Sequence, residues 1–513
     1  MFPRILLLLT LSVVLTGCAV GPDYVRPDQN TAVPEQWNQQ AAARQTTKMA
    51  AAPGPTMAEA LPDGAAGSNW QWWREFGDTT LDTLVTDALV YNNDLAAAVG
   101  RVLEARALYG GSQSALWPSV EIGGTGTRTK TADQFVFGPF SPYVNQYDVS
   151  ATMRYEVDLW GRLSRGKEAA LATLMASEQD RRAVAQSLIA DVVRTWLQIR
   201  ELHLQVALAN RTVANFQQNL TTVRERYQRG LVSPLDVHLA SQNLASAQAT
   251  GPLFKQQLGE AKRRLEILVG RYPAGDIMAS DLDNAGGFLE AEIMPEPLAA
   301  VPAGLPSHLL ERRPDLQAAE LRLHSSVARI GEAKSALYPR LSLTASAGTK
   351  SREFSELFTS PTGVWNLAGN VFMPLINRGA TQAQIKAAEA RAEQATAGYR
   401  KAVLVAFGEV ENALDQDIYQ AAQENFLADS AEQARRSVDL AQDRYRRGLD
   451  SLLITLESQR RLFTAENQLL STQRARRTAR VNLILALGGP WETAAVSAQN
   501  SNTTVNPEEG AQK

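Results

Sequence analysis

The sequence predicts an α+β membrane protein in which each of two repeated halves joins long helices to a pair of strands. Three observations predict it. The segments 226–233 and 444–451 share the pattern Arg-Tyr-x-Arg-Gly-Leu-x-Ser, a long proline-free stretch precedes the first of them, and apolar and polar residues alternate strictly over 147–157. A repeat of this length indicates one architectural unit present twice. The match between 114–118 (Ser-Ala-Leu-Trp-Pro) and 335–339 (Ser-Ala-Leu-Tyr-Pro) supports the duplication.

The longest helices are expected to be coiled-coil elements. In 161–229, Val192 and Ile199 belong to a row of apolar residues at every seventh position, the spacing of a coiled-coil seam. Such a helix is roughly 100 Å long. Its copy spans 378–447. The shorter helices are expected over 79–116, 233–269, 307–337 and 451–487. Because the two shorter helices of each half together match the long one, they are expected to stack end to end beside it.

The alternating segments predict four strands in two hairpins. The clearest strand has apolar residues on one face, and its polar face carries Asp148, Ser150, Thr152, Arg154 and Glu156. Strands of this length can cross an outer membrane, but four strands cannot close a barrel, and open edges in lipid leave backbone groups unpaired. Several chains must therefore share one barrel. Two chains would give a filled eight-stranded barrel and three a twelve-stranded barrel with a lumen that these polar residues line.

The N-terminus predicts a lipid anchor. A short basic start and an apolar run too short to span a bilayer precede Leu15-Thr16-Gly17-Cys18, the pattern of a bacterial lipoprotein cleavage site. Cys18 is the only cysteine, so it has no disulfide partner within the chain, and we expect it to be the acylated first residue of the mature protein. Ala19 follows it, which does not signal retention at the inner membrane. We therefore expect a lipid-anchored outer-membrane protein that extends into the periplasm.

The composition argues against several other classes. The formal net charge of −3 is too small to indicate nucleic-acid binding. No phosphate-binding loop with its lysine is present, and the four histidines are scattered without the spacing of metal ligands. We therefore expect no enzymatic activity, no metal and no cofactor other than the lipid on Cys18.

These patterns divide the chain into six segments. They are a signal peptide (1–17), a lipid anchor with an extended equatorial segment (18–78), a first repeat (79–269), an equatorial linker (270–306), a second repeat (307–487) and a C-terminal tail (488–513).

Together, the cleavage site, the following Ala-Val-Gly-Pro-Asp-Tyr (19–24), the Tyr-x-x-Gly turns and the duplicated helix-hairpin-helix halves resemble the outer-membrane efflux protein family typified by TolC. The closest resemblance is to its lipoprotein branch, that of OprM and the NodT-type factors of RND pumps. The resemblance implies a homotrimer with a shared twelve-stranded barrel, continuous with an α-helical periplasmic tunnel. It also implies a periplasmic adaptor and an inner-membrane RND-type transporter as partners, in a pump of the kind that confers multidrug resistance.

The resemblance implies site residues as well. The adaptor-docking turns match Gly230-Leu231 and Gly448-Leu449, although glycine at these positions is also expected simply to end a helix. The leucine ring of the closed tunnel matches Leu453. The acidic ring matches Glu457, a position at which the family usually has aspartate. Three facing carboxylates would raise one another's pKa; the alternative is a solvated surface charge. Tyr445 and Arg446 can be read as part of a latch on the gate, or Arg446 as a cation that complements the helix dipole.

The predicted function is passive conduction from a pump to the cell exterior. The alternatives within and outside this class are the outer-membrane duct of a type I secretion system and a structural envelope lipoprotein that does not conduct. The alternating strands distinguish the channel from the structural protein, because only the channel needs them. The cargo is not predicted by the sequence.

Overall fold

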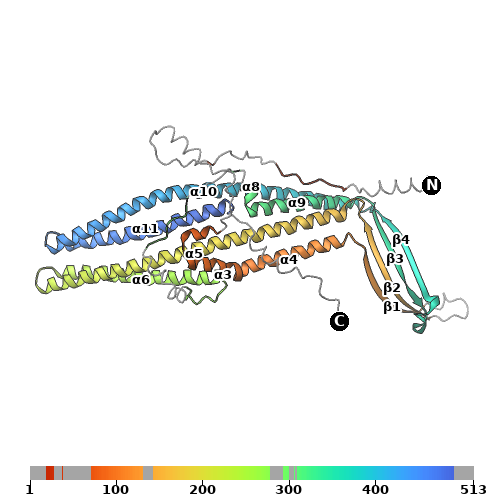
Figure 1. Cartoon of the computed structure of the whole chain (residues 1–513), viewed down its shortest axis with the longest axis horizontal. Coiled ribbons are helices and arrows are strands. Elements are labelled where there is room, and N and C mark those ends of the chain that lie inside the picture. Colours follow the sequence, from red (N-terminus) through yellow and green to blue (C-terminus); the bar gives the residue numbers. More distant parts are fainter. Residues whose placement is uncertain are drawn as a thin grey trace, which may run out of the picture. The chain divides into compact units, whose positions relative to one another are not determined.

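The structure is a computed structural model that describes residues 19–27, 37, 71–130, 143–277, 293–299, 306 and 309–489. Both halves have the predicted order of helices and strands (Figure 1). The first half consists of α3 (Thr79–Tyr91), α4 (Asn93–Ser114), β1 (Ser119–Lys130), β2 (Tyr143–Val157), α5 (Arg162–Gln228) and α6 (Pro234–Leu268). The second consists of α8 (Leu309–Arg312), α9 (Pro314–Ser335), β3 (Arg340–Ser351), β4 (Gly363–Phe372), α10 (Arg378–Arg446) and α11 (Leu452–Ala486). Short 3-10 turns lie at Trp72–Phe76 (η1), Phe354–Glu356 (η4) and Ser360–Thr362 (η5). The predicted duplication is confirmed.

The chain forms two compact units. The sheet unit comprises Met1–Asn30, Val99–Asp180 and Asp315–Ala402, and the turn unit comprises Thr31–Ala98, Arg181–Pro314 and Val403–Lys513. The long helices α5 and α10 contribute to both units because each is far longer than a globular core requires.

In the sheet unit, four antiparallel strands lie in the order β1-β2-β3-β4. The register places Val120, Met153, Ala345 and Leu367 across from one another. Because side chains opposite each other share a face and alternate along each strand, these residues define an apolar face. Within the described residues, β1 and β4 each pair with one strand only, so the sheet ends in two open edges.

The first helix of each half is broken, in contrast to the continuous helices predicted over 79–116 and 307–337. The breaks fall at Asn92, between α3 and α4, and at Arg313, between α8 and α9. Asn92 adopts an extended conformation and its side chain caps the next helix by accepting from the Leu95 N–H at 3.0 Å. Pro314 begins α9, and proline disfavours a helical residue before it.

The two breaks mark equivalent helix junctions in the turn unit. The Asn92 side-chain amide donates to the carbonyl of Leu268, the last residue of α6, at 2.9 Å. In the second half, Arg313 donates to the carbonyl of Ala486, the last residue of α11, at 3.1 Å. Each break residue thus satisfies a C-terminal carbonyl of the helix that meets it, as end-to-end stacking of the shorter helices requires.

The core of the turn unit is the predicted coiled-coil seam. Val192, Trp196 and Ile199 of α5 are fully buried, and they belong to a cluster that also includes Leu265 of α6 and Val481 of α11. Tyr227, at the end of the same row, is 46% exposed. The seam side chains are therefore buried in the middle of α5 and partly exposed to solvent near the turn at its end.

In the sheet unit, a strap of extended chain over residues 19–27 lies against the helices. The Val20 N–H donates to the Trp160 carbonyl at 3.1 Å. The Tyr24 ring stacks on His324 with centroids 4.7 Å apart, and its hydroxyl donates to Glu320 at 3.0 Å. Arg26 donates to both oxygens of the same carboxylate. The strap therefore runs along one face of α9.

Cys18 and the signal segment lie outside the described residues. Among the described helices, none combines the length and the apolar character that a membrane-spanning helix needs.

Candidate functional site

Both helical hairpins of the turn unit end in the same turn. Gly230 and Gly448 have φ values of +71° and +74°, in the left-handed region that glycine adopts most easily. The Leu231 N–H donates to the Arg226 carbonyl and the Leu449 N–H to the Arg444 carbonyl, each at 2.9 Å. These hydrogen bonds satisfy the terminal carbonyls of α5 and α10 in the Schellman pattern. The shared sequence of the two segments thus codes for one turn geometry.

Each turn presents apolar side chains to solvent. Leu231 is 67% exposed and Leu449 is 62% exposed. Helix termination accounts for the glycines, and an apolar residue directly after the glycine is common in this type of turn. Each glycine of the predicted docking turns is thus followed by one exposed leucine.

The second turn is closed by an ion pair within itself. Arg444 donates from Nε to Asp450 at 2.6 Å, and this hydrogen bond holds the pKa of Asp450 below its ordinary value. Arg447, which directly follows α10, pairs with Asp443 of that helix at 2.9 Å. Both arginines that flank Tyr445 and Arg446 therefore have partners in their own hairpin.

Arg226 links the two hairpins. Its guanidinium donates to the carbonyls of Tyr445 and Arg446 at 3.2 and 2.9 Å, and lies 4.6 Å from the centre of the Tyr445 ring. Both carbonyls belong to the last turn of α10, beyond the reach of its own N–H groups; the Tyr445 carbonyl also accepts from the Gly448 N–H at 3.0 Å. A cation there is also favoured by the helix dipole and by the aromatic face. One side chain thus fastens the end of α5 to the end of α10.

A small core supports this link. Val223 of α5, Leu244 of α6, Tyr445 of α10 and Leu456 of α11 are buried in one cluster, and Asn219 donates to Gln459 at 2.7 Å. The two hairpins are therefore packed together within a single chain near the turns.

The predicted gate residues lie on the exposed side of α11. Leu453 is 62% exposed, and Glu457 follows four residues later on the same helical face. The Glu457 carboxylate accepts hydrogen bonds from Arg461 and Arg460, each at 2.8 Å. These bonds, from Arg461 first and Arg460 second, hold the pKa of Glu457 below its ordinary 4.5.

The second candidate region is the polar face of the sheet. The register places Asp148, Ser150, Thr152 and Arg154 on the face opposite the apolar one. Arg154 pairs with Glu121 of β1 at 2.6 Å, and Glu156 pairs with Arg162 at the start of α5 at 2.8 Å. The predicted polar residues therefore share one surface, on which their charges are largely paired.

Sequence reasoning missed several of these residues. Arg226 is the counterpart of Arg444 in the repeat, but Val232 stands where the second turn has Asp450. Comparing the two repeats would have shown that Arg226 lacks the local partner that Arg444 has. Arg460 and Arg461 lie three and four residues after Glu457, a spacing that places them beside it on a helix.

Among the described residues, no group of histidine, cysteine, aspartate and glutamate side chains is placed to hold a metal ion.

Comparison with known proteins agrees with this architecture. The family model of the outer membrane efflux protein matches residues 84–271 and 305–489. The toluene efflux pump outer membrane protein TtgF of Pseudomonas putida is 31% identical over 495 residues, which cover 96% of this chain and 98% of that protein. The pyoverdine export outer membrane protein OpmQ of Pseudomonas aeruginosa is 31% identical over 491 residues, covering 95% and 97%.

Solved structures share the fold. The outer-membrane channel OprN superposes with a TM-score of 0.79 at 28% identity, covering 92% of this chain and 99% of that one. The open state of the MtrE outer membrane channel of Neisseria gonorrhoeae superposes with a TM-score of 0.73 at 26% identity, covering 92% and 98%. The predicted fold class, that of TolC-like channels, is confirmed. The chain is a member of the outer membrane efflux protein family.

Proposed function

We propose that three copies of this chain form the exit duct of an efflux pump in the bacterial outer membrane. The observation that carries the proposal is the four-stranded sheet, which has one apolar face, one polar face and two open edges. Edges in lipid must be paired, and three such sheets joined edge to edge give twelve strands around a lumen. The long hairpins of each chain then form the tunnel that leads to it.

The apolar face of the sheet fits lipid. Ile122 and Trp365 are each 82% exposed, and Leu367 is 72% exposed. Apolar side chains are not normally gathered on one exposed face of a soluble protein, whereas the outside of a membrane barrel requires it. A lipid on Cys18, next to the start of the strap, would hold the chain to the same membrane.

The turns are the proposed contact with a periplasmic adaptor, and Leu453 and Glu457 the proposed gate. Arg226, Tyr445 and Arg446 hold the two hairpins of one chain together. Opening of the gate therefore requires either that this link breaks or that both hairpins move together. An adaptor opens the gate only if it binds the open state more tightly than the closed one. Energy for transport then comes from an inner-membrane transporter of the RND type.

Small organic molecules are the proposed cargo. The relatives are named for toluene and pyoverdine, which favours this class over the secretion of proteins. The duct conducts and does not catalyse, and its polar lining is drawn from Asp148, Ser150, Thr152 and their neighbours on the strands.

The experiment is to measure ion current through the purified, acylated protein in planar lipid bilayers. The wild type is expected to conduct weakly and the Leu453→Ala, Glu457→Ala double variant strongly, because the substitutions widen the constriction. Ile454→Ala is the matched control, since Ile454 is also exposed on α11 but lies one position away from the Leu453 face. Absence of current in every variant would contradict the channel and favour the non-conducting envelope lipoprotein.

A further inference from the structure

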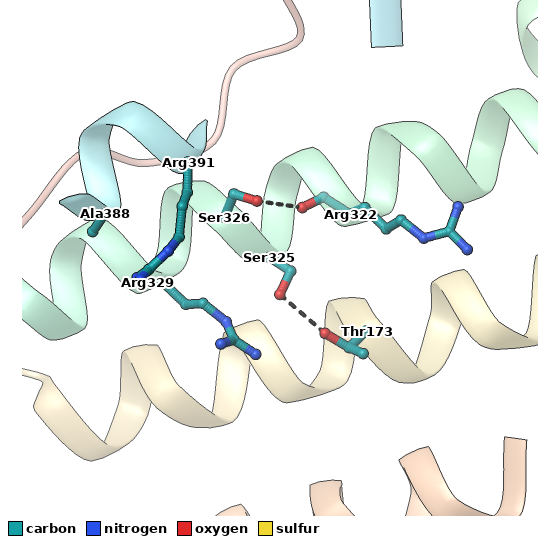
Figure 2. Close-up of a pocket in the computed structure, with 7 residues that line it drawn as sticks. All are labelled: Thr173, Arg322, Ser325, Ser326, Arg329, Ala388 and Arg391. Atoms are coloured by element: carbon teal, nitrogen blue, oxygen red, sulfur yellow. Dashed lines mark hydrogen bonds between the residues drawn. The ribbon is translucent and has the colours of Figure 1, made fainter. Parts of the chain in front are cut away.

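A groove of about 270 Å³ lies over α9 in the sheet unit, between α5 and α10. Three arginines and three hydroxyl side chains line it, namely Arg322, Arg329, Arg391, Thr173, Ser325 and Ser326. Figure 2 shows Arg329 and Arg391, from neighbouring helices, on the same side of α9. The groove is therefore a positively charged surface shared by three helices.

The hydroxyl groups of the groove already donate hydrogen bonds to backbone carbonyls. Thr173 and Ser325 both donate to the carbonyl of Ala169, at 2.8 and 2.9 Å, and Ser326 donates to the carbonyl of Arg322 at 2.9 Å. These groups are therefore not placed to donate to a solute. Any attraction of the groove for an anion must come from its guanidinium groups.

Two of the three arginines carry uncompensated charge. Arg322 is paired with Asp180 of α5. For Arg329 and Arg391, no hydrogen-bond or ion-pair partner occurs among the residues that the structure describes, and both side chains are exposed. Each chain thus places two free guanidinium groups on this face.

The two sides of α9 face different surroundings. Glu320 and His324 contact the strap, whereas Arg329, nine residues after Glu320, lies about 180° around the helix from it. The flanks of α9 are covered, by Thr173 of α5 on one side and by Ala388 and Ala392 of α10 on the other. The arginine face is therefore opposite the strap.

The strap indicates which side faces outward. It leads to Ala19 and hence to the position where we propose a lipid, and a lipid anchor must reach the bilayer around the barrel rather than the water inside it. The strap side of α9 is then the outside of the tunnel wall. The opposite side, which carries Arg329 and Arg391, faces the lumen.

We propose that Arg329 and Arg391 form a cationic belt in the tunnel lumen that favours anionic over cationic solutes. This inference rests on the proposed function and adds a charge preference to it. Like charges facing a narrow water-filled passage reinforce one another's field and concentrate counter-ions there. Carboxylates, sulfonates and phosphates are the solute groups that such a belt would attract.

The test is the charge selectivity of the pore, measured as a reversal potential across a gradient of about 0.1 M against about 0.01 M KCl, where screening is weak. It uses the Leu453→Ala, Glu457→Ala protein, with or without Arg329→Gln and Arg391→Gln. We expect the ratio of chloride to potassium permeability to fall about two-fold or more when both arginines are removed. The difference should shrink in about 1 M KCl, where the Debye length is about 3 Å.

Lys334→Gln is the matched control. Lys334 is also a cation of α9, but it pairs with Glu389 at 3.0 Å and lies about 40° from Glu320 around the helix, on the strap side. It should leave the permeability ratio unchanged. A conducting pore whose ratio is the same with and without the two arginines would overturn the belt alone. A protein that never conducts would overturn the channel, and the belt with it.

Discussion

Individual side chains in the turn unit show how two nearly identical turns acquired different roles. Arg444 and Arg226 occupy equivalent positions, yet Arg444 closes its own turn with Asp450 while Arg226 reaches the end of α10. The difference follows from one residue, because Val232 replaces the aspartate in the first turn. The repeat could be predicted from the sequence, but the partner of Arg226 could not, since it depends on which hairpin lies next to it.

Arg226→Ala should loosen the proposed gate. The substitution leaves the Arg446 carbonyl without its Arg226 donor, whereas the Tyr445 carbonyl keeps the Gly448 N–H. It also removes the cation over the Tyr445 ring, for a total loss of about 1–3 kcal/mol. We expect a larger open fraction in single-channel recordings. Arg224→Ala is the control, because Arg224 is an exposed arginine one half-turn earlier on α5. An open fraction equal to that of the control would contradict the link.

The conductance of the wild-type pore should not change with pH between about 5 and 7. The hydrogen bonds from Arg461 and Arg460 lower the pKa of Glu457. Ion pairs of a carboxylate with a lowered pKa are complete above the ordinary value and are lost only as pH falls through the lowered one. In the Arg460→Gln, Arg461→Gln variant, unshielded carboxylates of three chains should titrate at higher pH. If the wild-type current instead changed near pH 6, repulsion between the Glu457 carboxylates of different chains would raise their pKa more than Arg460 and Arg461 lower it.

At the level of elements, the strap and α9 are fitted to each other at two facing glycines, Gly21 and Gly331. A Cβ added to Gly331 would lie 2.8 Å from the Val20 carbonyl oxygen and 3.0 Å from Cγ of Arg165. The strap residues can be read in the sequence, but their path cannot. It is decided by contacts with a helix some 300 positions away, such as that of Tyr24 with Glu320, which are 296 residues apart.

Gly331→Ala should displace the strap without weakening the helix. Alanine favours a helix over glycine by about 1 kcal/mol, so any loosening must come from the clash with Val20 and with Arg165, which pairs with Asp23 of the strap. We expect chymotrypsin to cleave after Tyr24 faster than in the wild type. Gly398→Ala on α10, where a Cβ meets nothing within 4 Å, is the control. Equal cleavage rates in the two variants would show that the strap is not held at Gly331.

At the scale of the whole molecule, the open edges of β1 and β4 show that a single chain cannot form a closed barrel. A sheet with unpaired edges and an exposed apolar face is incomplete in lipid. We expect native mass spectrometry of the detergent-solubilised protein to give three times the mass of the denatured chain. A mass ratio of two would instead indicate the filled eight-stranded barrel, and a ratio of one would contradict a shared barrel altogether.

The sequence by itself determined the duplicated order of elements, the long helices and the two faces of the sheet. These follow from local periodicity, from proline and glycine positions and from the polar and apolar alternation, all of which act over a few residues. Only the tertiary structure decided the break at Asn92, the hydrogen bonds of Arg226 to the end of α10 and the side of α9 on which Arg329 lies. Those features depend on which helix ends and faces meet, and residues far apart in the chain supply them.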